Sequence, residues 1–307
     1  MNTFSGPLVT PSELQDALKT QRPSVKVLDA SWHLGDRGRG KAEYLKGHIP
    51  GAMFFDIDAV ADTSSSLPHM LPSAGVFSDK VSAMGIGNDQ SVVVYAAEGS
   101  FSAARCWWTF KVFGHDAVHV LDGGLPAWVG AGGALEEGEV KGQDIRPSRG
   151  LVQKSGNTWL LNQKAFKATL RPQMLRTWRQ VLDASTARSG QIVDARSMAR
   201  FKAEAPEPRP GLAGGHIPGS LCVPFTEVLM TGDWTRFKSS EEIREVFQSA
   251  GIDVDSPDPL ITSCGSGVTA AVLTMALHLA GRDCTTSPVY DGSWSEWGGR
   301  DDLPKET

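Results

Sequence analysis

One cysteine of this chain lies where the backbone itself would favour a thiolate. Cys264 opens the loop Cys264-Gly265-Ser266-Gly267-Val268-Thr269, which follows an apolar run over 259–263 and precedes a helical pattern over 270–280. A strand, a tight loop and a helix start direct unpaired N–H groups and the positive end of the helix dipole at that position, and both stabilise an anion. We therefore predict a nucleophilic thiolate that can hold an anionic adduct.

The residues around this cysteine decide between a chemical and a packing role. A buried cysteine that packs as a small hydrophobe is the alternative interpretation. Gly265 and Gly267 favour the chemical one, because glycine adopts backbone conformations that other residues avoid. Thr269 adds a hydroxyl that is predicted to cap the following helix.

Composition limits the classes of protein that fit. The chain has 307 residues, 40% of them hydrophobic and 21% charged, with a net charge of −5. This composition is typical of a soluble globular protein large enough for two domains. The negative net charge argues against nucleic acid as a partner, so any anion site must be built locally.

Sparse cysteines and a plain N-terminus suggest a reducing compartment. The four cysteines, Cys106, Cys222, Cys264 and Cys284, form no metal-binding spacing. The first residues lack the basic start and apolar core of a secretory signal, and no stretch has the length of a membrane span. We expect a cytoplasmic protein that does not bind membranes, with a mitochondrial location as the alternative if a presequence has been removed. No metal or organic cofactor is expected.

The two halves of the sequence repeat one another. Four blocks recur in the same order at offsets between 165 and 169 residues. The pairs are 27–31 with 192–196, 47–52 with 215–220, 92–95 with 259–262, and 122–128 with 291–297. So small a drift predicts two copies of one domain.

Each copy alternates short β-branched runs with helical patterns. In the first copy we predict helices over 11–18 (opened by Thr10), 76–85, 103–113 and from 125, and strands over 25–30, 91–96 and 118–122. Such alternation predicts an α/β fold, a mostly parallel sheet with helices on both faces, with sites at the carboxyl ends of the strands. The predicted ranges are 1–135 for the first domain, 136–157 for a linker rich in glycine and charge, and 158–307 for the second domain.

Motifs along nearly the whole chain carry a family resemblance. They are 28–32 (LDASW), 48–52 (HIPGA), 54–58 (FFDID), 69–72 (HMLP), 107–108 (WW), 122–125 (DGGL), 207–209 (EPR), 215–219 (GHIPG), 264–269 (CGSGVT) and 290–294 (YDGSW). On these the chain resembles the tandem-domain sulfurtransferases of the rhodanese superfamily, including those that use 3-mercaptopyruvate. The resemblance implies two rhodanese-like domains, of which the second is catalytic.

The first copy lacks the nucleophile. Its loop 97–102 aligns without gaps with 264–269, and Ala97 stands where the cysteine would be. Persulfide chemistry is therefore expected at Cys264 only, with the first domain supplying one wall of the cleft. The resemblance implies that the amides of Gly265, Gly267, Val268 and Thr269 hold the outer sulfur and the substrate.

The loop side chains indicate the donor. Thiosulfate rhodaneses carry basic residues after the cysteine, whereas this loop has Gly265 and Ser266. A neutral loop suits a thiol-bearing 2-oxo acid, whose carboxylate calls for arginine. Arg200 and Arg209 match the family's two substrate-binding arginines, whereas Arg196 is expected to be structural.

Proton movement needs further residues. The resemblance implies a relay of Ser266, His69 and Asp58, with Asp56 as the alternative carboxylate, which follows the logic of a catalytic triad. His48 and His216 occur in both copies, including the one without a cysteine, so they are expected to be structural.

Four functions are considered for a chain with this sequence. The favoured one moves sulfur from 3-mercaptopyruvate through a Cys264 persulfide to a thiol, a thioredoxin-like protein or cyanide, releasing pyruvate. A thiosulfate:cyanide sulfurtransferase and a non-catalytic sulfur-carrier or binding module are the alternatives. A phosphatase of related fold is disfavoured, because its loop ends in an arginine and Ala270 follows Thr269 here.

Overall fold

Contacts divide the chain into two units. The computed structural model describes residues 3–20, 25–140, 152–155, 158–161 and 165–307. The first unit comprises Met1–Asp56 and Pro72–Leu170, and the second comprises Ile57–Leu71 and Arg171–Thr307. The second unit thus includes a segment from the first half of the sequence. The domain ranges 1–135 and 158–307 stay predictions, and residues 141–151 and 156–157 of the predicted linker lie outside the described part.

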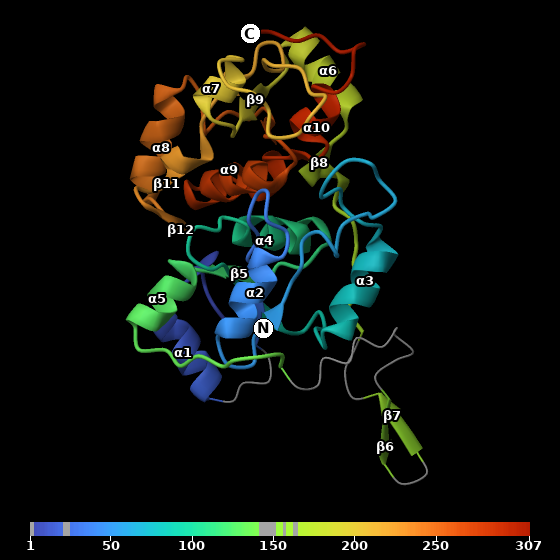
Figure 1. Cartoon of the computed structure of the whole chain (residues 1–307), viewed down its shortest axis with the longest axis vertical. Helices are drawn as coiled ribbons and strands as arrows, with labels where there is room; N and C mark the ends of the chain where they lie inside the picture. Colours follow the sequence, from blue (N-terminus) through green and yellow to red (C-terminus); the bar gives the residue numbers. More distant parts are fainter. Residues whose placement is uncertain (1–2, 21–24, 141–151, 156–157, 162–164) are drawn as a thin grey trace. The chain divides into compact units, whose positions relative to one another are not determined.

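The first unit is built on a five-stranded parallel sheet (Figure 1). Its strands, in spatial order, are β1 (Leu8–Val9), β5 (Val118–Leu121), β4 (Ser91–Tyr95), β2 (Val25–Asp29) and β3 (Met53–Phe54). Its helices are α1 (Pro11–Lys19), α2 (Arg39–Lys46), α3 (Ala74–Ala83), α4 (Ala103–Val112) and α5 (Gly124–Gly130). The helix and strand predictions for this copy are correct to within two residues at most ends, and Thr10 does cap α1.

The second unit repeats this order. Its strands are β8 (Leu175–Arg176), β14 (Val289–Tyr290), β13 (Leu260–Ser263), β9 (Gln191–Asp194) and β10 (Leu221–Cys222). Its helices are α6 (Trp178–Ala187), α7 (Met198–Phe201), α8 (Ser240–Ser249), α9 (Val268–Leu279) and α10 (Ser293–Trp297). Between these elements lie three short 3₁₀ helices, η1 (Pro172–Met174), η2 (Phe225–Val228) and η3 (Cys284–Thr286). The matching strand order confirms the predicted duplication.

Two antiparallel hairpins lie outside the main sheets. One joins β6 (Val152–Ser155) to β7 (Thr158–Leu161), and the other joins β11 (Leu229–Met230) to β12 (Asp233–Phe237). Neither hairpin is predicted from the sequence. The first hairpin falls across the end of the predicted linker and the start of the predicted second domain.

Helices cover both faces of the second sheet, as predicted. On one face, Ile261 of β13 belongs to a core that also contains Val181 of α6 and Trp294 of α10. The next residue along β13, Thr262, faces the other way and shares a 2.9 Å hydroxyl–hydroxyl hydrogen bond with Thr274 of α9. Because side chains alternate along a strand, the two cores lie on opposite faces of one sheet.

In each repeat, the backbone of a histidine pairs with that of a glutamate near the end of the repeat. His48 and Glu136 exchange backbone hydrogen bonds of 2.9 and 2.8 Å, and His216 and Glu306 exchange bonds of 2.7 and 3.0 Å. The His48 ring stacks on Tyr44, as the His216 ring stacks on its own aromatic partner, Phe201. These contacts match the structural role that the sequence predicts for both histidines.

A buried arginine fixes the carboxyl end of β9. Arg196 bonds both carboxylate oxygens of Asp194 and also donates to Glu207 at 2.7 Å. Its guanidinium lies over the Trp294 ring, 4.3 Å from the centroid. Burial alone would lower the pKa of Arg196, but the two carboxylates outweigh burial and raise it. Arg196 is therefore structural, as expected.

Replacing this arginine should strongly destabilise the second unit. Arg196→Met would leave the carboxylates of Asp194 and Glu207 buried without their cation, which costs about 3–5 kcal/mol. Urea unfolding monitored by tryptophan fluorescence measures the loss. The exposed Arg244–Asp255 pair supplies the control, since Arg244→Ala should cost at most about 1 kcal/mol. Equal losses in the two variants would contradict the structural role of Arg196.

Candidate active site

The turn from β13 into α9 directs two backbone N–H groups at one sulfur atom. The Cys264 sulfur accepts hydrogen bonds from the amides of Gly267 at 3.1 Å and Ser266 at 3.4 Å. Cys264 is 1% exposed, so little water competes for the sulfur. Helix α9 begins immediately afterwards, and the positive end of its dipole adds to the same field. The loop is thus built to stabilise negative charge on sulfur.

Gly267 adopts the backbone conformation that the sequence predicts for a glycine in this loop, whereas Thr269 does not cap the helix. Gly267, with φ of 80°, is the residue that caps α9, and the helix starts at Val268, two residues earlier than predicted. Thr269 lies inside the first turn of α9 and is not the cap, so that prediction is wrong. A Cβ on Gly265 would lie 3.1 Å from Nη2 of Arg200, a tight contact that the guanidinium would have to shift slightly to relieve.

The start of α10 supports the loop from the other side. The Cys264 amide donates to the hydroxyl of Ser293 at 3.2 Å, and the Cys264 carbonyl accepts from the Trp294 amide at 2.9 Å. The Gly265 carbonyl accepts from both the amide and the hydroxyl of Ser295, at 2.9 and 2.6 Å. These bonds fix the backbone that carries the sulfur. The sequence by local pattern assigns no role to these two serines.

Two arginines converge on this loop. Besides Arg200, the Nη1 atom of Arg209 lies 3.8 Å from the position of a Cβ on Gly265. Arg209 also donates from Nη2 to the Ser266 hydroxyl at 3.3 Å. Burial lowers the pKa of Arg209, and Arg200 adds to this while the Cys264 sulfur opposes it. An arginine stays cationic at neutral pH even so, which leaves a positive charge beside the sulfur.

The two arginines differ in how they are neutralised. Arg200 bonds both carboxylate oxygens of Glu207, at 3.2 and 2.5 Å, and the same carboxylate holds Arg196. Glu207 thereby joins the structural cation at β9 to the cation at the loop. The sequence named Glu207 only as part of a motif, and its place between two arginines could not be predicted without the fold.

The predicted imidazole and its carboxylate do come together. His69 Nδ1 lies 2.9 Å from an oxygen of Asp58, and both residues belong to the second unit. His69 is 6% exposed and has a left-handed backbone with φ of 61°. The alternative carboxylate, Asp56, is exposed and belongs to the first unit. A contact between His69 and Ser266 stays a prediction.

Hydrogen bonds join the matching loop of the first unit to the residues that follow β2. The Ala97 amide donates to the Ser31 hydroxyl at 2.7 Å, and the fully buried Ser100 hydroxyl bonds both the amide and the carbonyl of Trp32. Ala97 offers no nucleophile. This loop is therefore a packed turn, in agreement with the expectation that the first copy carries no persulfide.

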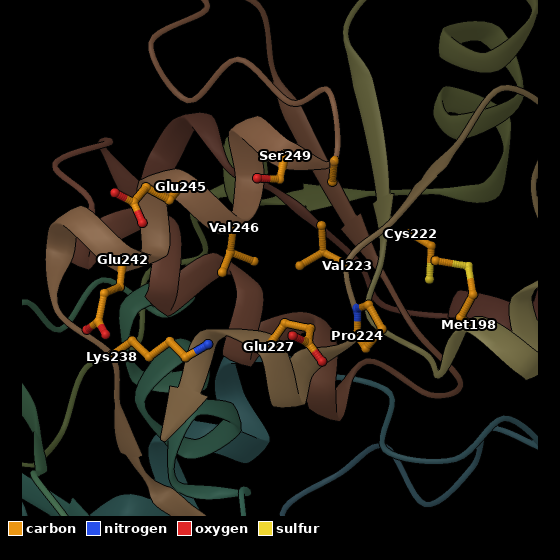
Figure 2. A pocket seen from close by; sticks show the side chains of 11 residues that line it. Met198, Cys222, Val223, Pro224, Glu227, Lys238, Glu242, Glu245, Val246 and Ser249 are labelled. Atoms are coloured by element: carbon orange, nitrogen blue, oxygen red, sulfur yellow. The ribbon is translucent and has the colours of Figure 1, made fainter. Parts of the chain in front are cut away.

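A separate pocket lies beside the edge strand β10 (Figure 2). It has a volume of about 590 Å³ and is lined by residues that include Cys222, Glu227, Lys238 and Glu245. None of the predicted site residues lines it. Burial, aided by Asp194, raises the pKa of Cys222 to about 12, so this cysteine stays a thiol at neutral pH.

Neither a metal-binding cluster nor a membrane-spanning helix occurs among the described residues. These residues contain no cluster of three or more His, Cys, Asp or Glu side chains that could hold a metal ion. Within the same residues, each helix is too short or too polar to span a bilayer. The four cysteines all lie among the described residues, and none of them forms a disulfide.

A family model matches both halves of the chain. The rhodanese-like domain model matches residues 10–131 and again 177–300. The first match contains the loop without a cysteine, and the second contains Cys264. The duplication is therefore one of rhodanese-like domains.

Curated relatives cover nearly the whole chain. The thiosulfate/3-mercaptopyruvate sulfurtransferase 1 of Arabidopsis thaliana is 42% identical over 99% of this chain and 79% of its own length. The 3-mercaptopyruvate sulfurtransferase of Escherichia coli K12 is 42% identical over 92% of both chains. The thiosulfate sulfurtransferase of Rattus norvegicus is 40% identical over 98% of this chain and 94% of its own.

A solved structure agrees with these relatives. The crystal structure of SseA from Escherichia coli, a 3-mercaptopyruvate sulfotransferase, superposes with a TM-score of 0.77 and 37% identity. The match covers 94% of this chain and 99% of that one. With two domain matches, full-length relatives and this structural likeness, the chain belongs to the rhodanese-like family, among its two-domain sulfurtransferases.

Proposed function

We propose that this protein transfers sulfur from 3-mercaptopyruvate through a persulfide on Cys264. The observation that supports this most is one arrangement: two amides directed at the Cys264 sulfur, with Arg200 and Arg209 beside Gly265. The amides suit a persulfide anion, and the arginines suit the carboxylate of a 2-oxo acid. The names of the Escherichia coli and Arabidopsis relatives agree with this donor.

The first half-reaction leaves a carbanion that must gain a proton. The Cys264 thiolate attacks the donor sulfur, the carbon–sulfur bond breaks, and its electron pair leaves on the enolate of pyruvate. The proton first carried by the donor thiol goes to that carbon, which yields pyruvate and the persulfide anion. Ser266, His69 and Asp58 are proposed to move this proton, with Asp58 orienting the imidazole from 2.9 Å.

The second half-reaction restores the thiolate. A thiolate acceptor, from a small thiol or a thioredoxin-like protein, attacks the outer sulfur, and Cys264 leaves with the electron pair of the sulfur–sulfur bond. Cyanide would leave as thiocyanate by the same displacement. The amides of Gly265, Gly267, Val268 and Thr269 are proposed to contact the outer sulfur or the substrate. The cytoplasm stays the predicted location, with the mitochondrion as the alternative.

Thiosulfate is the second candidate donor. The rat thiosulfate sulfurtransferase is about as similar to this chain as the 3-mercaptopyruvate enzymes are, so identity does not separate the donors. The loop side chains favour the oxo acid, because Gly265 and Ser266 bring no charge of their own after the cysteine. A sulfur-carrier module without turnover is disfavoured by the two arginines beside the Cys264 loop.

Removal of the nucleophile should abolish transfer from both donors. In Cys264→Ser the hydroxyl cannot accept sulfur, so the variant should stay folded but lack the one-sulfur mass increase that either donor produces on the wild-type peptide. Mass spectrometry after each donor alone measures this. Cys222→Ser removes a cysteine that stays a thiol and should keep full activity. Turnover by Cys264→Ser would refute the assigned nucleophile.

Removal of Arg209 should weaken binding of the oxo acid. Losing a charge-assisted contact to the carboxylate costs about 1.5–3 kcal/mol, so Arg209→Ala should raise the KM for 3-mercaptopyruvate about ten- to hundredfold. The KM for thiosulfate should change far less. Arg200→Ala should have a smaller effect, since Glu207 already neutralises Arg200, and the exposed Arg236→Ala should have none. Equal effects on the two donors would argue against carboxylate binding.

Removal of the Ser266 hydroxyl should slow turnover of 3-mercaptopyruvate more than turnover of thiosulfate. Ser266→Ala should lower kcat for 3-mercaptopyruvate by about a hundredfold or more, the usual size of proton-transfer catalysis, because the enolate needs a proton. Sulfite leaves thiosulfate as an anion, so that reaction should suffer less.

A double variant tests whether the relay acts as one unit. His69→Ala should show the same donor bias, and Ser266→Ala/His69→Ala should be no slower than the worse single variant. Losses that multiply in the double variant would place the two residues in separate steps.

A further inference from the structure

A buried carboxylate ties the segment that carries His69 to the strand next to the cysteine loop. Oδ2 of Asp291 accepts a 2.7 Å hydrogen bond from the amide of Leu71, a residue 220 positions earlier. Asp291 is 4% exposed and directly follows β14, the strand paired with β13. Both partners belong to the second unit.

The same short stretch holds the cysteine loop. Ser293, Trp294 and Ser295 bond the backbone of Cys264 and Gly265, as described above. Residues 291–295 therefore bond both the nucleophile's loop and the His69 segment. One short stretch of chain thus links two parts of the candidate site that are far apart in sequence.

His69 needs such support because its backbone is strained. A non-glycine residue with φ of 61° is held only where its surroundings fix it. The next two residues supply the fixed points: the Met70 carbonyl accepts from the Asp62 amide at 2.7 Å, and the Leu71 amide donates to Asp291. Of these two bonds, only the one to Asp291 reaches the elements around Cys264.

We propose that Asp291 is the positioning residue that holds His69 in place relative to the Cys264 loop. The proposal rests on the function proposed above, in which His69 moves the proton to the pyruvate enolate. Asp291 touches neither donor nor sulfur in this scheme and acts through the Leu71 amide. Its loss should therefore affect the step that needs the proton and spare the attack on sulfur.

Comparing 3-mercaptopyruvate with thiosulfate distinguishes proton transfer from attack on sulfur, because both donors need the attack and the proposed relay serves the first. Asp291→Ala should lower kcat for 3-mercaptopyruvate about ten- to hundredfold, the effect of an ångström-scale misplacement, and change thiosulfate turnover by much less. Asp291→Asn keeps an oxygen acceptor for the Leu71 amide and should restore most of the rate. Asp122→Ala is the matched control, because Asp122 occupies the same place in the repeat without a cysteine and should leave the ratio of the two donors unchanged.

Hydrogen exchange tests the tether without any assay of activity. Peptides covering residues 57–71 should exchange faster in Asp291→Ala than in the wild type and in Asp291→Asn, while peptides of β13 and α9 keep their protection. Wild-type protein without sulfur transfer would refute the proposed function. An active wild type whose Asp291→Ala variant keeps both its donor ratio and its protection over 57–71 would refute the role of Asp291 alone.

Discussion

A sulfur atom held by two backbone amides is the feature around which the second unit is organised. Amides can point at Cys264 only if the chain turns sharply from β13 into α9, and Gly267 makes that turn with a left-handed backbone. The turn in turn needs rigid support, which α10 supplies through hydrogen bonds to Cys264 and Gly265. The chemistry of the site therefore depends on the packing of three elements.

One carboxylate, that of Glu207, partly neutralises the positive charge beside the Cys264 sulfur. Glu207 binds Arg196, which is structural, and Arg200, which faces the loop, so Arg209 is the loop cation that this carboxylate does not bond. Burying several cations together would cost free energy without such a partner. The network keeps two guanidiniums near Gly265 while limiting their mutual repulsion.

Comparison of the two repeats separates fold from chemistry. Both repeats contain a histidine whose backbone pairs with that of a glutamate, His48 with Glu136 and His216 with Glu306. Both also have the same order of strands, because both domains build the same kind of sheet. Where the active repeat has Ser293 and Ser295 against its loop, the other has Gly124 and Pro126, which lack hydroxyls. This difference was visible in the sequence, but its meaning depends on which backbone the hydroxyls bind.

The duplication, the parallel sheets and the candidate nucleophile could be predicted from the sequence, because periodicity, repeats and a glycine-bearing loop are patterns that can be read without the fold. The sequence could not determine that residues 57–71 pack with the second unit, that Gly267 and not Thr269 caps α9, or that Glu207 and Asp291 bind Arg200 and Leu71. Those facts follow from contacts between residues far apart in the chain or from the handedness of a single turn. Such contacts are decided only when the sheet and its helices pack, since no local pattern specifies which distant groups meet.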